Sequence, residues 1–171
     1  MAEEGMNTAW VEVEYNEIWD RFDAVFRFRP SKGRIFLRPA IKEPSPSETY
    51  SIAHIFGQGE EHYIDLNNDL MAFALAMFQS LTAVEEWIYA LDWQHQAFKF
   101  FPHIAFELDE FGEWPVPVLP NGDYYIFFKE SFVWGVFGHP WEKTMCFWGD
   151  DVLTCLHENR PRLLTKPVRK K

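Results

Sequence analysis

The hydrophobic pattern is most regular near the C-terminal end of the chain. Three aromatic-rich runs, residues 123–128, 132–137 and 143–148, are separated by short turns. Runs of this length that are rich in aromatic and β-branched residues predict strands. We therefore expect a three-stranded antiparallel meander. Both faces of each run are apolar, so this sheet must be covered on two sides or must offer one side to a partner.

Two segments show helical spacing instead. Apolar residues in segment 16–26 recur every three or four positions, which predicts an amphipathic helix. Residues 69–81 are apolar nearly all round, which predicts a deeply buried helix with Asn67 or Asn68 as its N-cap. A small helix is expected at 152–158.

The remaining apolar runs complete the predicted fold. They predict strands at 34–38, 49–56, 86–93 and 97–101, of which the last two form a hairpin. This order of elements predicts an α+β fold in which an antiparallel sheet of about five or more strands has both main helices packed on one face. The other face is then covered by the proline-rich segment 27–56, or it forms a groove or a dimer surface.

A chain of 171 residues has the size of one domain. We expect a single globular domain over residues 1–159 and a basic tail over residues 160–171. With two prolines and few apolar residues, the tail is expected to be mobile or to lie on the acidic body.

Charge is distributed unevenly along the sequence. Residues 43–159 contain 19 acidic and three basic residues, whereas the tail contains six basic residues and no acidic one. An acidic body repels phosphate backbones, so we expect no nucleic acid ligand and favour a basic protein partner. The alternative is that the acidity only keeps an aromatic-rich protein soluble.

Several classes of protein are disfavoured by missing patterns. The sequence shows no export signal, its longest uncharged apolar run is short for a bilayer span, and its two cysteines, Cys146 and Cys155, are too few for a disulfide framework. We therefore expect a cytoplasmic protein with no membrane partner. No nucleotide loop, nucleophile elbow or spaced set of metal ligands is found, so no cofactor and no metal are predicted.

Two turns contain residues capable of acid–base chemistry. Asp92 and His95 lie at the end of one predicted strand, and His139 and Glu142 lie between two others. If the two turns meet at one sheet edge, the four residues would form a hydrolase-like site. The alternative is that each histidine only bonds a backbone carbonyl.

The long acidic loop at residues 102–120 is a further candidate, because long loops in compact domains are often functional. Its acids lack the pattern of a calcium loop, and a solvated loop is the alternative. The candidate binding residues are Trp93, Trp114, Trp134, Trp141, Glu107, Asp109, Glu110 and Glu113.

The segments 89–103 (YALDWQHQAFKFFPH) and 113–153, which contains FGHPWE, resemble a bacterial family known as domain of unknown function 2716. The resemblance extends over about residues 14–155 and implies a soluble, bacterial, single-domain protein with no established activity. The order of helices before an aromatic meander also looks similar to the immunity proteins of the Smi1 and Knr4 superfamily, at the level of the fold.

Together these features favour a non-enzymatic protein-binding module, of an immunity or antitoxin-like kind, that takes a basic protein partner. The alternatives are a small hydrolase using Asp92, His95, His139 and Glu142, and a homodimer formed through the meander face.

Overall fold

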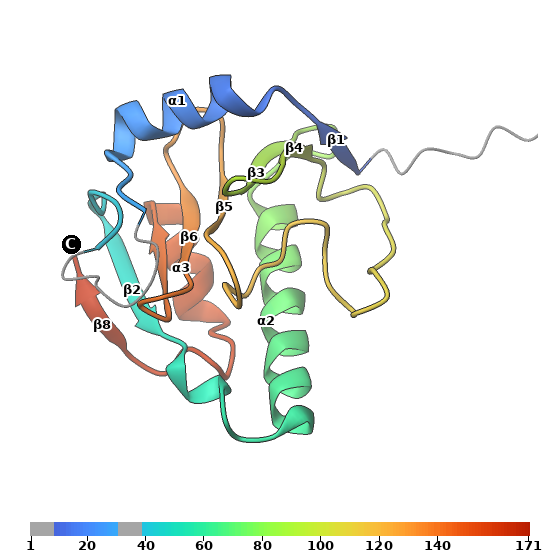
Figure 1. Cartoon of the computed structure of the whole chain (residues 1–171), viewed down its shortest axis with the longest axis vertical. Coiled ribbons are helices and arrows are strands. Elements are labelled where there is room, and N and C mark those ends of the chain that lie inside the picture. Colours follow the sequence, from blue (N-terminus) through green and yellow to red (C-terminus); the bar gives the residue numbers. More distant parts are fainter. Residues whose placement is uncertain (1–8, 31–38) are drawn as a thin grey trace, which may run out of the picture.

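The computed structural model describes residues 9–30 and 39–171. Over these residues the chain forms one sheet of eight antiparallel strands, in the order β1-β4-β3-β5-β6-β7-β2-β8, together with three α-helices (Figure 1). The elements are β1 (Trp10–Glu12), α1 (Tyr15–Phe26), β2 (Ser47–Ser51), the 3-10 helix η1 (Ala53–Ile55), α2 (Glu60–Ser80), β3 (Ile88–Asp92), β4 (Ala97–Phe100), β5 (Tyr125–Phe128), β6 (Gly135–His139), β7 (Thr144–Trp148), α3 (Asp150–Glu158) and β8 (Pro167–Lys170). The strand predicted at 34–38 lies outside the described residues.

The α+β class, the antiparallel sheet and the meander are confirmed. Strands β5, β6 and β7 are consecutive neighbours, and the predicted hairpin is formed by β3 and β4. The first predicted helix corresponds to α1, and the small C-terminal helix corresponds to α3. The strand predicted at 49–56 is shorter, because β2 ends at Ser51 and η1 follows it.

The main helices lie on opposite faces of the sheet, so the prediction that both pack on one face is wrong. Helix α1 buries Phe22 and Phe26 against a cluster that includes Phe128. Helices α2 and α3 bury a second cluster that includes Phe78 and Phe127. In Figure 1, α1 crosses the top of the molecule, whereas α2 descends on its right-hand side. We refer to the two sides as the α1 face and the α2 face.

The second meander strand begins later than the predicted run 132–137. Phe132 has a left-handed φ of 62° and lies in the turn, so β6 begins only at Gly135. Val136 then pairs with Phe127 and points to the α2 face, whereas Phe137 pairs with Ile126 and points to the α1 face. Helices therefore cover both meander faces. The homodimer that the sequence offers as an alternative stays a prediction.

Helix α2 begins at Glu60, well before the predicted start at residue 69. Its first half is mostly polar, and Leu66 and Asn67 are the residues of that half that are buried, so helical periodicity is weak there. Asn67 is therefore not an N-cap but an interior helix residue, and its Nδ2 donates to Glu113 Oε1 at 2.9 Å.

The basic tail lies on the acidic body, the second of the two expected alternatives. Strand β8 pairs with β2, and Arg162 Nη1 lies 2.8 Å from Asp65 Oδ2. Leu163 and Leu164 are buried in the same cluster as α2. The core thus continues beyond residue 159, so residues 160–171 are part of the fold and do not form a flexible tail.

Close packing explains the glycine inside β6. A Cβ atom at Gly135 would lie 2.5 Å from the backbone oxygen of Phe127 and 2.5 Å from the ring of Trp148. We expect Gly135→Ala to lower the free energy of unfolding by about 1–3 kcal/mol, the usual range for overpacking. Urea denaturation measures this, with Gly122→Ala as the control, because a Cβ there meets its nearest atom at 3.8 Å. Equal effects of the two substitutions would contradict the expectation.

Candidate functional site

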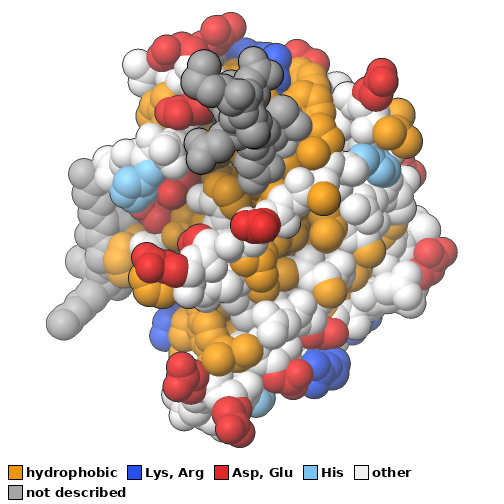
Figure 2. Space-filling view, turned by 90° about the vertical axis from the view of Figure 1, so that its right-hand side faces the viewer, with side chains coloured by type: hydrophobic (Ala, Val, Ile, Leu, Met, Phe, Trp, Pro, Cys, Tyr) orange, Lys and Arg blue, Asp and Glu red, His pale blue; other side chains and the backbone are white. Residues whose placement is uncertain are grey.

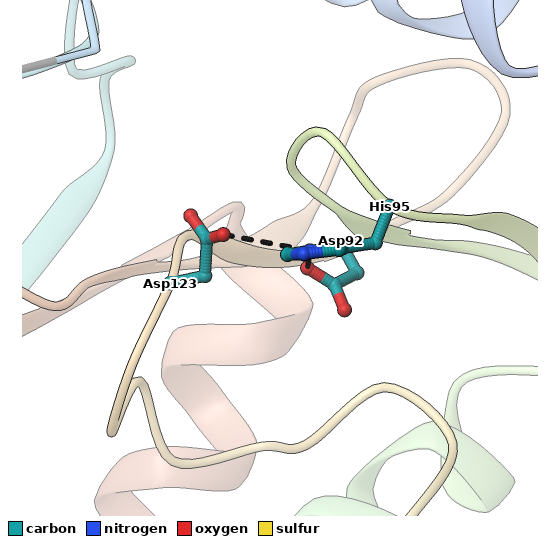
Figure 3. A group of neighbouring side chains, drawn as sticks. All are labelled: Asp92, His95 and Asp123. Atoms are coloured by element: carbon teal, nitrogen blue, oxygen red, sulfur yellow. Dashed lines mark hydrogen bonds and ion pairs between the residues drawn. The ribbon is translucent and has the colours of Figure 1, made fainter. Parts of the chain in front are cut away.

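The imidazole of His95 lies between two carboxylates (Figure 3). Its Nδ1 is 2.8 Å from Asp92 Oδ1 and 3.5 Å from Asp123 Oδ2. We call these three residues the Asp–His–Asp cluster. It contains two of the predicted catalytic candidates, Asp92 and His95, together with Asp123, which the sequence did not suggest.

Backbone hydrogen bonds position the cluster at one end of the sheet. Asp92 is the last residue of β3, and the turn that follows is closed by a bond of 3.1 Å from His95 N to Asp92 O. The loop before β5 is joined to this turn by Trp93 N, which donates to Tyr124 O at 3.1 Å. Asp123 Oδ1 accepts from Tyr124 N at 2.8 Å, while its Oδ2 faces His95.

Burial and charge alter the protonation equilibria of the cluster. Burial raises the pKa of Asp92, and the negative charge of Asp123 raises it further, against the hydrogen bond from His95. Burial likewise raises the pKa of Asp123. The hydrogen bond to Asp92 raises the pKa of His95, whose side chain is 60% exposed. Among the described residues, no lysine or arginine forms a salt bridge with either carboxylate.

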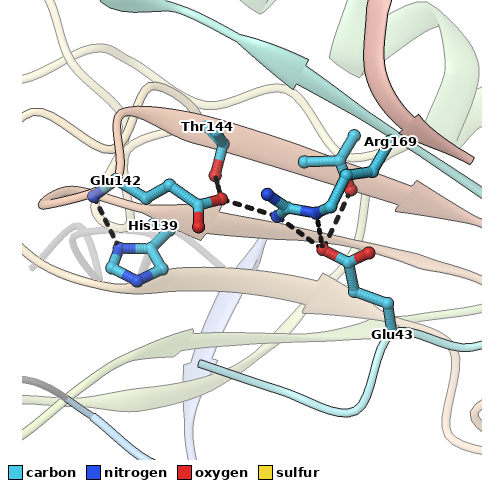
Figure 4. A network of polar contacts seen from close by, with 6 residues as sticks. Glu43, His139, Glu142, Thr144 and Arg169 are labelled. Atoms are coloured by element: carbon cyan, nitrogen blue, oxygen red, sulfur yellow. Dashed lines mark hydrogen bonds and ion pairs between the residues drawn. The ribbon is translucent and has the colours of Figure 1, made fainter. Parts of the chain in front are cut away.

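The other candidate pair belongs to a second polar cluster (Figure 4). Glu142 N donates to His139 Nδ1 at 3.1 Å. Arg169 Nη2 lies 2.6 Å from Glu142 Oε1 and 2.6 Å from Glu43 Oε1. Thr144 Oγ1 also donates to Glu142 Oε1, at 2.7 Å. We call the group formed by Glu43, Glu142 and Arg169 the Arg169 network.

The pKa shifts in this second cluster reflect structural pairing. Burial alone would raise the pKa of Glu142, but hydrogen bonds from Arg169 and Thr144 lower it overall. Burial works against the charge of Arg169, yet Glu43 and Glu142 together raise its pKa. Burial lowers the pKa of His139 to about 4, so the imidazole is neutral at pH 7. A neutral, buried histidine beside ion-paired carboxylates is typical of a structural element.

The two candidate pairs lie on opposite faces of the sheet. In the sheet, Asp92 pairs with Tyr125, and Tyr125 pairs with Gly138. Directly paired residues point to the same face. Because Tyr125 packs on the α2 face, Asp92 and Gly138 belong to that face as well. His139 follows Gly138 and therefore points to the α1 face, where its ring centroid lies 4.9 Å from that of Tyr124. The four-residue hydrolase site that the sequence offers as an alternative is therefore not assembled, because its two pairs point to opposite faces of the sheet.

The predicted binding residues have different environments. Trp114 and Trp134 are each 3% exposed and belong to the core. Trp93 is half-buried against the α1 cluster, and Trp141 is 42% exposed. The loop acids Glu107, Asp109 and Glu110 are exposed, whereas Glu113 is half-buried beside Asn67, and burial raises its pKa.

The acidic loop also exposes large apolar side chains, which are not among the predicted binding residues. Ile104, Leu108 and Phe111 are 36%, 49% and 81% exposed. Ile104 and Leu108 line a shallow groove of about 390 Å³ whose other walls include Leu75 of α2. We call α2 and loop residues 102–114 the loop face. Figure 2 shows hydrophobic side chains reaching the surface over this side of the molecule, with acidic side chains around and among them.

The loop is anchored at its base and ordered at its tip. The ring of Phe106 packs edge-on against two other rings, with its centroid 5.5 Å from that of Phe100 and 5.6 Å from that of Trp114. At the tip, Asp109 Oδ1 accepts from the backbone nitrogens of Phe111, at 2.8 Å, and Glu113, at 2.9 Å. The exposure of Phe111 is therefore built into the turn and does not result from loose chain.

The chain is a small α+β protein whose single sheet is buried on both faces. It has a polar cluster at one end of the sheet and a loop surface on which acidic and apolar side chains are mixed. The chain belongs to the family described as "Protein of unknown function (DUF2716)", whose model matches residues 10–153. This confirms the family resemblance seen in the sequence. None of the helices in the described part of the chain combines the length and apolar character that a membrane span requires.

A relative is similar in sequence over most of the chain. The uncharacterized protein YxiI of Bacillus subtilis (strain 168) is 34% identical over 154 residues, which are 89% of this chain and 93% of the relative. No solved structure matches the chain. Neither the family description nor the relative's name assigns an activity.

Proposed function

We propose that the protein is a non-enzymatic binding module that takes a basic protein segment on its loop face. The observation behind this proposal is the 81% exposure of Phe111 at the tip of an ordered acidic turn. Ile104 and Leu108 of the same loop are exposed as well, and several exposed apolar side chains on one surface mark an interaction site.

Charge defines the chemistry of the partner. Glu107, Asp109 and Glu110 alternate with or flank the exposed apolar side chains, and residues 43–159 contain 19 acidic residues against three basic ones. A field of this sign speeds the approach of a basic surface, while the apolar side chains supply the contact that holds it. The expected partner segment therefore combines lysine or arginine with large apolar residues.

The ordered loop also favours tight binding. Because Phe106 fixes the base of the loop and Asp109 fixes its tip, little chain entropy is lost when a partner docks. An immunity or antitoxin-like role, in which the module covers a basic toxin, fits these properties. Cys146 and Cys155 are free thiols, which fits the cytoplasmic location that we also propose.

Selection from a display library of random short peptides tests this function. We expect the wild-type protein to enrich peptides that are rich in lysine or arginine and contain large apolar residues. The double variant Leu108→Ser/Phe111→Ser should bind the selected peptides at least about tenfold more weakly, since each lost contact of this kind weakens binding by about 1 kcal/mol or more.

Two controls separate this surface from general charge attraction. Val133→Ser changes an apolar side chain that is 59% exposed in the β5–β6 turn, away from the loop, and should leave peptide affinity unchanged. Glu107→Gln/Glu110→Gln should reduce affinity at low salt more than at high salt. Enrichment of acidic peptides, or equal binding by the Leu108→Ser/Phe111→Ser and Val133→Ser variants, would refute the proposal.

A further inference from the structure

We propose that the Asp–His–Asp cluster is a binding site for a divalent transition-metal ion of the zinc or cobalt type. One imidazole nitrogen and two carboxylate oxygens, from Asp92, His95 and Asp123, all lie within 4.8 Å of one another. Bond lengths to zinc are about 2.0–2.2 Å, so two ligand atoms on one tetrahedral ion lie roughly 3.4 Å apart. The observed separations of 2.8 Å and 3.5 Å from His95 Nδ1 bracket that value.

The charge of the cluster is a second argument, independent of the distances. The side chains of Asp92 and Asp123 are only 17% and 20% exposed, and within the described chain His95 is the cationic group that contacts them. One imidazolium can neutralise only one of two carboxylates. A divalent ion in place of the proton on Nδ1 neutralises both.

The three ligands are already held in position. Asp92 and His95 lie on a turn closed by the backbone bond between them, and Asp123 is fixed through its Oδ1 by Tyr124 N. The remaining oxygen, Asp123 Oδ2, faces the imidazole (Figure 3). Outer hydrogen bonds that orient ligands in this way strengthen metal binding, because few torsions have to be fixed when the ion enters.

The ligand set also defines the class of ion and the openness of the site. A nitrogen donor with two carboxylates suits zinc, cobalt or nickel, whereas calcium and magnesium prefer sites made only of oxygen ligands. Three protein ligands leave at least one coordination position, and the 60% exposure of His95 opens it to solvent. We infer that water or a small anion occupies that position.

Titration of the full-length, metal-free protein with Co²⁺ and Zn²⁺ tests the site. We expect one Co²⁺ per chain with the visible absorption of a low-symmetry site, and displacement by Zn²⁺. Paramagnetic broadening in NMR spectra should centre on residues 92–95 and 123–125. His95→Gln should abolish the absorption, and Asp123→Asn should weaken binding at least about tenfold.

A matched variant excludes binding by an isolated surface histidine. His54→Gln removes another exposed histidine, in η1, and should leave affinity and spectrum unchanged. Thermal unfolding of each metal-free variant checks that the fold is retained. The proposal is overturned if the wild-type protein takes up no ion, or if His95→Gln or Asp123→Asn binds as tightly as the wild type. It is independent of the loop face, so either proposal can fail alone.

Discussion

Replacing Arg169 by methionine is expected to lower the free energy of unfolding by about 3 kcal/mol. Glu43 is 3% exposed and Glu142 is 16% exposed, and both carboxylates rely on the single guanidinium of Arg169. Methionine keeps most of the side-chain volume but leaves two carboxylates without their cation. The value lies at the low end for broken buried ion pairs, because Arg169 is itself 32% exposed.

Urea denaturation at pH 7 measures this loss, and two further variants identify its cause. Lys166→Met removes a charge from an exposed side chain of the same segment and should change stability by less than about 0.5 kcal/mol. Adding Glu142→Gln to Arg169→Met should recover part of the loss, since only one uncompensated carboxylate then remains. An Arg169→Met variant as stable as Lys166→Met would show that the network does not hold β8 in place.

The spacing of apolar residues predicts those helices and strands that bury one whole face or both faces. Helix α1 has a continuous apolar stripe and was predicted within one residue of its observed start, Tyr15. Short turns between dense aromatic runs predict the meander. By contrast, the first half of α2 buries so few residues that its sequence shows little helical spacing of apolar residues. Strand β8 is a short edge strand in which half-buried and exposed residues alternate, and the sequence does not predict it.

Placement of elements relative to one another could not be predicted in the same way. The apolar character of both strand faces showed that two layers must cover the sheet, but it did not show that α1 and α2 take different sides. The phase of β6 depended on the left-handed φ of Phe132, which is uncommon for a bulky residue outside a special turn. The turn around Phe132 therefore fixes Val136 on the α2 face and Phe137 on the α1 face.

The candidate site was predictable only where its parts are close in sequence. Asp92 and His95 are three residues apart, and their contact follows from the turn. Asp123 joins them because β3 and β5 are neighbours in the sheet, although the acidic loop separates them in sequence. The exposed position of Phe111 could have been suspected, since an aromatic residue among acids and glycine has few partners nearby in the chain.

His139 should make the protein less stable as the pH falls from about 6.5 to about 4. Burial lowers its pKa to about 4 in the folded state, whereas an unfolded chain has the ordinary value of about 6.5. Between these values the unfolded state binds more protons, so stability rises with pH and is lost on acidification. The slope is at most about 1.4 kcal/mol per pH unit, which amounts to about 3 kcal/mol over the whole interval.

His139→Asn tests this origin of acid sensitivity. Asparagine offers an oxygen that can accept the hydrogen bond from Glu142 N in place of His139 Nδ1, but it does not titrate. Unfolding free energies from urea denaturation at pH 7, 6 and 5 should therefore change less steeply with pH in this variant than in the wild type. His54→Gln, which removes an exposed histidine, should keep the wild-type slope. If His139→Asn also keeps it, the acid sensitivity arises in the carboxylates, and the imidazole of His139 is protonated in the folded protein well above pH 4.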